Sequence, residues 1–523
     1  MAVTHVQLGG ELSGRSILGG NRNKVEWWGM LTGLVLTAAC ALATIQWAWT
    51  IILWALVFGA VFVVWSPRAS TGHASVMGWV GIRRRWTHHR RSGVLDYPGA
   101  VAVQEADDGQ PHLPISMGRM RGFEVELWPG REDPGRVHVL RHRQQDETVY
   151  TAVFEFRAQR AGVMTQMDGL RNHTGWGELE ATLARQGSLV RDVQQVARVV
   201  PFDPADHVSW LIDELPDGPP QVLVQSYADL VDDRIATHEQ NRTWLVVGIP
   251  AAGAFNSAAQ RVSLPEGAEE LTAAEKFELR ESAVLAGELR RVVSRGRSVG
   301  MSFRPLSERR EAAVFRSLQD PDVPLDKLDG ADKYSMWLPW IGSDSRRYLR
   351  IQGSERDWYT RTAIVPRDGF ASGPIPVDSL VPLLTGVNPP VIRTVTTHAS
   401  LIPASAARAE AKSDVTTDRG TVSGNAAKVS GGEAEAQMSA SQQRLDDLRP
   451  GSGIHGASWA LAVTIQAASL DELEQATNQI EEAAADSNIT SIVWQDSRHH
   501  LSLPMTLPLS MGVNHRRKKG LFR

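Results

Sequence analysis

Residues 456–495 read GASWALAVTIQAASLDELEQATNQIEEAAADSNITSIVWQ. Apolar and polar residues alternate over 456–468, which predicts a half-buried β-strand. Its inward face consists of Trp459, Leu461, Val463 and Ile465. Ser469 is followed three residues later by Glu472, a pair typical of a capping box at a helix start. The stripe that this helix is expected to bury consists of Leu470, Leu473, Ala476 and Ile480. The final ITSIVWQ predicts a returning strand, so the stretch predicts a β-α-β unit.

The same order of elements occurs twice earlier in the chain. The first occurrence begins at ETVYTAVFEFRAQ, where strict alternation predicts a half-buried strand. The predicted elements that follow are a helix at 175–187, a strand at 188–201, a strand at 242–250, a helix at 272–296, a strand at 298–306 and a helix at 307–318. These patterns predict an α+β fold in which β-α-β units lie on small mixed sheets.

The net charge of −4 over 523 residues is unevenly distributed. Residues 1–91 carry nine Arg and Lys against two Glu, and residues 516–523 carry five basic residues, which leaves 92–515 at −16. Nucleic-acid binding depends on clustered positive charge, so the acidic body argues against direct nucleic-acid binding. Cys40 is the only cysteine, which excludes an intrachain disulfide and a cysteine-based zinc site.

Residues 27–65 contain no charged side chain. One helix of this length would be about 58 Å long, roughly twice the thickness of a bilayer core, so two spans fit better. Tryptophans near both ends and the middle are typical of membrane interfaces. A signal peptide would be shorter and would end at a small-residue cleavage site, and a buried core hairpin is the other alternative. The sequence therefore predicts a transmembrane helical hairpin.

Basic residues flank this stretch on both sides, which predicts that both ends face the cytoplasm. The expected location is the plasma membrane, multi-pass, with the bulk of the chain in the cytoplasm. The segment 78–91 mixes two tryptophans with five arginines, which predicts contact with anionic lipid headgroups. The arginines concerned are Arg83, Arg84, Arg85, Arg90 and Arg91. A topology signal without lipid contact remains an alternative.

Composition divides the chain into segments. An excursion rich in Ala, Ser and Gly is expected to be helical at its ends, weak in its middle and mobile. The predicted segments are a cytoplasmic N-terminus at 1–26, the transmembrane hairpin at 27–65, a basic juxtamembrane segment at 66–91, an α+β domain at 92–330, a strand-rich continuation at 331–403, the excursion at 404–450, a C-terminal β-α-β unit at 451–510 and a basic tail at 511–523.

A search for catalytic chemistry gives no candidate residue. No G-x-x-x-x-G-K-[ST] phosphate loop occurs, and GSGIHG at 451–456 precedes a strand rather than a helix, so we interpret it as a turn. The pairs His88–His89 and His499–His500 lack the spacing of shared metal ligands, and no G-x-S-x-G elbow occurs. The sequence thus predicts a protein that is not an enzyme, with no cofactor and no metal.

Several segments in order resemble a known family. They are WGELEATLARQGSLVRDVQQVARVVP, LVDDRIATHEQNRTWLVVGIPA, LRRVVSRGRSVGMSFRPLSERREAAVFRSLQDPD, VPRDGF and LRPGSGIHGASWALAVTIQAASLDELEQATNQI, closed by LPMTLPLSMG. With the preceding hairpin, this order resembles actinobacterial integral membrane proteins encoded with conjugation and type IV secretion modules. The part after the hairpin is similar to the N-terminal, non-motor domain of the type IV secretion ATPase.

The resemblance carries an expectation about function. In the ATPase, a segment like LPMTLPLSMG leads into a RecA-like motor, which does not follow here. It therefore implies a non-enzymatic inner-membrane component of a conjugative or type IV-like secretion apparatus, which anchors a separately encoded hexameric secretion ATPase. Further implied partners are membrane lipid and other secretion-channel subunits, with a homo-oligomer left open. The alternatives are a core membrane subunit of a type VII secretion system and, more remotely, a membrane-tethered hydrolase.

The tail NHRRKKGLFR combines positive charge with two apolar residues. Three interpretations remain open: a solvated end without a role, a contact with a lipid surface, or a docking peptide for the separate motor. The docking interpretation assigns contacts to Arg516, Arg517, Lys518, Lys519, Leu521 and Phe522.

Overall fold

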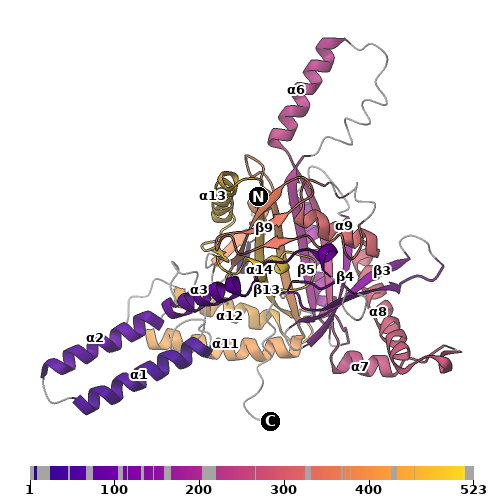
Figure 1. Cartoon of the computed structure of the whole chain (residues 1–523). Helices are drawn as coiled ribbons and strands as arrows, with labels where there is room; N and C mark the ends of the chain where they lie inside the picture. Colours follow the sequence, from indigo (N-terminus) through magenta and orange to yellow (C-terminus); the bar gives the residue numbers. More distant parts are fainter. Residues whose placement is uncertain are drawn as a thin grey trace.

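The structure is a computed structural model of the whole chain (Figure 1). It describes residues 5–8, 24–44, 48–65, 75–103, 110–114, 116–130, 135–144, 147–157, 166–185, 187–202, 220–265, 267–323, 325, 331–366, 369–370, 373–376, 378–425, 433–452 and 454–512.

One large β-sheet organises the fold. It has twelve strands, ten of them in the order β2-β3-β4-β6-β5-β12-β13-β10-β9-β8, while β7 pairs with β4 and β14 pairs with β10. Every pairing among the described strands is antiparallel. The strands are β2 (Met120–Glu126), β3 (Arg136–Gln144), β4 (Glu147–Arg157), β5 (Asp192–Pro201), β6 (Glu239–Pro250), β7 (Ser302–Pro305), β8 (Trp340–Ile341), β9 (Leu349–Gln352), β10 (Asp357–Val365), β12 (Ile392–Ile402), β13 (Gly456–Ala467) and β14 (Val493–Trp494). Separately, β1 (His5–Leu8) pairs with β11 (Gly373–Pro376).

The sheet consists of two halves with the same topology. The first half has the order β3-β4-β6-β5 with β7 added to β4, and the second has β9-β10-β13-β12 with β14 added to β10. The halves meet where β5 pairs with β12, from Val199 opposite Arg393 to Asp192 opposite Ser400. The fold is therefore a repeated unit joined edge to edge into one sheet.

The helices occupy equivalent places in the two halves. In the first half they are α4 (Gln166–Leu183), α6 (Gln221–Thr237), α7 (Gly253–Gln260), α8 (Ala273–Ser298) and α9 (Glu308–Gln319). In the second they are α10 (Val381–Leu384), α11 (Ala404–Asn425), α12 (Glu433–Asp447), α13 (Leu470–Asp486) and α14 (His499–Ser502). The helices α4 and α10 precede the central strands, and α8 and α13 follow the returning strands β6 and β13.

Both faces of the first half are covered. On one face Tyr150 and Phe154 of β4 pack into a core with α4, α7 and α8. On the other, Val153 and Trp244 pack with α9. The sequence predicted that β4 is half-buried, but Thr151 on its predicted polar face is also buried. A strand in the middle of a sheet with two covered faces has no solvent side.

The predicted small mixed sheets are wrong. The C-terminal β-α-β pattern does form β13, a helix α13 capped by Ser469, and β14. However, β14 pairs antiparallel with β10 and not with β13. Alternation in sequence identifies a strand but does not identify its neighbour, because pairing is decided by residues far away in the chain. The predicted stripe of α13 is confirmed except at Leu470, which is exposed.

The predicted transmembrane hairpin over 27–65 is contradicted. Two helices form there, α1 (Lys24–Thr44) and α2 (Ala48–Trp65), but no helix in the described part of the chain has the length and apolarity that a membrane span requires. The same finding contradicts the predicted multi-pass location in the plasma membrane and the membrane component of the expected function.

Residues 503–512 cross the face of the sheet instead of leading away from it. Gln194 of β5 donates hydrogen bonds to the carbonyls of Met505 (3.2 Å) and Leu507 (2.8 Å), and accepts one from the amide of Ser510 (2.6 Å). His398 of β12 donates to the Met505 carbonyl at 2.8 Å. We call this segment the strap. Its leucines Leu503, Leu507 and Leu509 are part of the core beneath α9.

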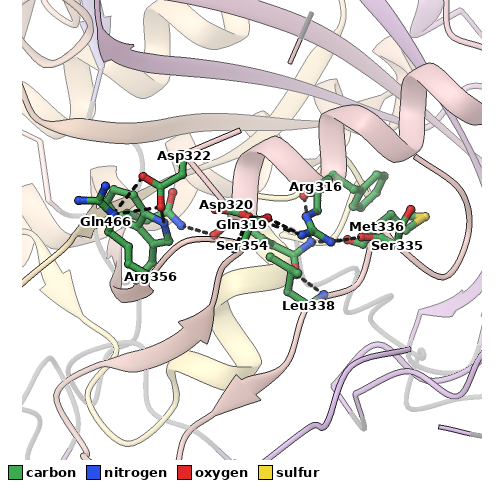
Figure 2. A network of polar contacts seen from close by, with 12 residues as sticks. Arg316, Gln319, Asp320, Asp322, Ser335, Met336, Leu338, Ser354, Arg356 and Gln466 are labelled. Atoms are coloured by element: carbon green, nitrogen blue, oxygen red, sulfur yellow. Dashed lines mark hydrogen bonds and ion pairs between the residues drawn. The ribbon is translucent and has the colours of Figure 1, made fainter. Parts of the chain in front are cut away.

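The C-terminal end of α9 is bonded to the second half through a buried polar network (Figure 2). The Gln319 amide nitrogen donates to the carbonyls of Phe315 (2.9 Å) and Met336 (2.8 Å), and its oxygen accepts from the indole of Trp340 (3.1 Å). Gln466 of β13 donates to the Gln319 carbonyl at 3.1 Å. The network therefore connects a helix of the first half to strands of the second.

Replacing Gln319 with Leu should destabilise the protein by about 2–4 kcal/mol, because buried donors and acceptors lose their partners. The midpoint of urea unfolding measures this. The matched control is Gln443→Leu on the exposed face of α12, which should change stability by less than about 0.5 kcal/mol. Equal midpoints for the two variants would show that the network does not stabilise the fold.

Acid should weaken the contact between the strap and the sheet. Burial lowers the pKa of His142 and of His398 to about 4. Both histidines are therefore neutral in the folded protein, and each stabilises it fully above pH 6.5. That contribution is lost as the pH falls from about 6.5 to about 4, at up to about 1.4 kcal/mol per pH unit for each group. In His398→Gln, the unfolding free energy should fall less steeply over this range than in the wild type. In the control His112→Gln, at an exposed site, the slope should be unchanged; a His398→Gln slope equal to the wild type's would contradict the assignment.

Candidate partner-binding surfaces

Helix α6 follows β5 and precedes β6 in the chain, and it projects from the sheet (Figure 1). Its described side chains are largely exposed, including Val222 at 79%, Leu223 at 63% and Leu230 at 50% of their full area. A helix in a globular protein normally buries one apolar stripe. The large exposed apolar side chains on α6 therefore indicate a surface for another molecule.

The apolar residues of α6 form one stripe. Leu223, Tyr227 and Leu230 are spaced four and three residues apart, which places them on the same face of a helix. Val222 and Val224 lie about 100° to either side of this row, and Val231 lies about 80° from it. This spacing is typical of the seam along which two helices pack.

Acidic residues flank the stripe. Asp229, Asp232 and Asp233 lie in the second half of α6, where Arg234 is the single basic residue. Gln225 donates a hydrogen bond to Asp229 at 3.0 Å, which holds that carboxylate on the polar face. The charge of α6 therefore favours a partner helix with basic residues beside its own apolar row.

The second half of the sheet shows how an equivalent connection is completed. There the strands β12 and β13 are joined by α11 and α12, which lie side by side (Figure 1). Ala407 and Ala411 of α11 are buried with Leu448, and Arg444 of α12 donates to Asp414 of α11 at 3.1 Å. In both halves one helix precedes the returning strand: α12 before β13, and α6 before β6. The helix α12 packs against a second helix, while residues 203–219, which precede α6, lie outside the described residues.

The structure places the five predicted arginines on one helix, α3 (Val76–Arg91). All five are exposed. The guanidinium of Arg83 lies 3.5 Å from the ring centre of Trp79, and that of Arg90 lies 5.4 Å from the ring centre of Trp86. Trp86 is buried and also faces Arg346 at 5.6 Å, which attaches α3 to the body. Nothing in this geometry tests the predicted role of these arginines at a lipid surface.

The predicted docking residues of the tail cannot be compared with the structure. Arg516, Arg517, Lys518, Lys519, Leu521 and Phe522 lie outside the described residues. The middle of the predicted excursion, 426–432, lies outside them too, while its two ends form the helices α11 and α12.

The sequence contained a signal for α6 that was missed. Taken alone, the run ADLVDD is typical of a solvated acidic stretch. Extended backwards, QVLVQSYADLVDDR carries apolar residues at the spacing of a helix seam. The charges concealed this periodicity, and nothing in the sequence shows that the stripe stays exposed.

Comparison with known proteins does not assign a family. No protein-family model matches the chain, and no curated protein matches it. The resemblance to conjugation and secretion proteins therefore stays a prediction.

Proposed function

We propose that this protein is a non-enzymatic scaffold of a conjugative or type IV-like secretion apparatus, and that it binds a separately encoded secretion ATPase. The contact lies on α6, which accepts an amphipathic helix of the ATPase. The proposal concerns binding between proteins and includes no membrane anchor.

One observation carries the proposal: α6 presents an exposed apolar stripe in a position where the other half of the sheet has packed helices. Leu223 and Leu230 are exposed, whereas Ala407 and Ala411 in the equivalent connection are buried. A helix laid along α6 would give the first half the arrangement that the second half already has. The order of segments in the sequence supports the choice of the ATPase as the partner.

Typical free energies indicate how much α6 contributes to binding. Burying one Leu or Val side chain fully contributes about 1.5–3 kcal/mol, while association costs about 4–15 kcal/mol in lost freedom. The stripe alone therefore supports a weak complex. Aspartates beside it attract a basic partner and speed the encounter, and a stable complex needs further contacts elsewhere on the scaffold.

The double variant Leu223→Ser, Leu230→Ser should bind the ATPase at least about tenfold more weakly, because two apolar contacts of more than about 1 kcal/mol each are lost. Titration of the separately purified ATPase encoded beside this chain, followed by calorimetry, measures the affinity.

The matched control is Val222→Ser, which removes an apolar side chain that is also exposed and lies about 100° around α6 from the row. It should lower the affinity less than the double variant does. The proposal fails if the wild-type protein does not bind the ATPase, or if the double variant binds as tightly as Val222→Ser. A double variant that unfolds at lower urea concentration and keeps its affinity would show that α6 is covered by its own chain.

A further inference from the structure

A cavity of about 230 Å³ lies between the edge of the first half of the sheet and the start of α9. Its walls come from β2, β3, α9 and the segments around 110–113 and 333–337. These segments are far apart in the sequence, so the cavity exists only in the folded protein. It is remote from the stripe on α6 and has no part in the proposed contact with the ATPase, since none of its lining residues belongs to α6.

One wall of the cavity is a buried pair of ionisable side chains. The Nδ1 atom of His138 on β3 lies 2.5 Å from Oε2 of Glu311 on α9. Glu311 is only 1% exposed, and its second oxygen, Oε1, has no hydrogen-bond partner. A buried carboxylate oxygen without a donor costs about 1–3 kcal/mol, so such an atom requires an explanation.

Another buried glutamate in this protein shows what a purely structural carboxylate looks like. Both oxygens of Glu239 are bonded: the guanidinium of Arg393 donates to each of them, and the amide of Gly386 donates to Oε2 at 3.0 Å. Glu311 has half of this coordination, and its residue lines a cavity. Because Glu311 lines the cavity, a molecule bound there can supply the donor that Oε1 lacks.

The position of His138 depends on Gly122 of β2. A Cβ atom at residue 122 would lie 2.2 Å from Nε2 of His138, which is closer than any real contact. Glycine at this position therefore lets the imidazole lie flat against β2 beside the cavity. Any larger side chain would displace the ring from Glu311.

Apolar side chains line much of the rest of the cavity. Met120, Leu140, Ala312, Met336 and Trp337 line it, and all five are buried. The ring of Trp337 is held by Phe315, whose ring centre lies 5.1 Å away. The volume equals that of about eight water molecules, which fits a molecule of fragment size that has an apolar body and one polar end.

The charges around the pair favour a positive polar end. Burial lowers the pKa of His138, but the carboxylates of Glu311, Glu308 and Glu124 outweigh burial and raise it above its ordinary value. Three carboxylates thus act on this wall, against the imidazole of His138 itself and Lys333 as the positive groups that line the cavity. Among the described residues no group of three or more His, Cys, Asp or Glu is arranged to hold a metal ion, so the charge that this wall favours is that of an organic cation.

We propose that this cavity binds a small primary amine, whose ammonium group donates a hydrogen bond to Oε1 of Glu311 and whose apolar body packs against Trp337 and Met336. A charge-assisted bond of this kind is stronger than one between neutral groups, so the amine is selected over a neutral molecule of the same shape.

The probe that tests this is 2-phenylethylamine, titrated into the full-length protein in a calorimeter. Two analogues serve as ligand controls: 2-phenylethanol, which keeps the shape without the charge, and phenylacetate, which reverses the charge. The amine should bind at least tenfold more tightly than the alcohol, and phenylacetate should not bind. Glu311→Gln should lower the affinity for the amine at least tenfold, to the level of the alcohol.

Two further variants complete the experiment. Glu281→Gln alters a second buried glutamate, which accepts a hydrogen bond from Tyr150 and does not line this cavity, and it should leave the affinity for the amine unchanged. Ala312→Leu fills the cavity while keeping every charge, and it should abolish binding even if Glu311→Gln does not fold. Absence of amine binding to the wild-type protein, equal affinity for the amine and the alcohol, or undiminished binding to Ala312→Leu or to a folded Glu311→Gln would each overturn the proposal.

Discussion

The pairing of β5 with β12 is the constraint on which the rest of the structure depends. It joins two units of the same topology into one sheet through eight residue pairs, from Val199 opposite Arg393 to Asp192 opposite Ser400. Without it, each half would end in an unpaired strand, and open strand edges invite pairing with other chains. Buried polar groups cross the same junction, since Arg198 of β5 donates to the hydroxyl of Thr394 on β12 at 3.0 Å. The strap is hydrogen-bonded to the same junction, because its partners Gln194 and His398 belong to β5 and β12.

Many individual strands and helices could be predicted from the sequence, whereas the pairing of the strands into one sheet could not. Alternation identified β4 and β13, and the Ser469 cap identified the start of α13, because these signals depend on near neighbours. The partner of β14 and the joining of the halves depend on residues more than a hundred positions apart, which no local pattern encodes. The prediction of a membrane hairpin over 27–65 rested mainly on apolarity, and no helix in the described residues qualifies as a span. The pair His138 and Glu311 has no sequence signature, since 173 positions separate its members.

The two halves differ most in the segments that connect β5 to β6 in the first half and β12 to β13 in the second. In the second half the connection between β12 and β13 is closed by α11 against α12, with small buried residues such as Ala407 and Ala411 at the contact. In the first half α6 carries Leu223 and Leu230, and both of these leucines are exposed. The two halves therefore share the strand order of the sheet and differ in the segments that connect the strands. The first half also holds the cavity at the start of α9, so both proposed binding sites belong to it.

The strap has a mechanical consequence. Its polar contacts reach across the sheet, from Thr464 of β13, which shares a hydrogen bond with Thr506, to Gln144 of β3, which donates to the carbonyl of Ser510. A tension applied to the chain beyond Gly512 would therefore act first at the first half of the sheet, where Ser510 is held, and only later at β13. Because the pull loads these bonds one at a time, they break one after another, and a small force is enough to peel the strap from its C-terminal end. The same pull directed along the sheet away from β13 would strain all of these bonds together and meet greater resistance.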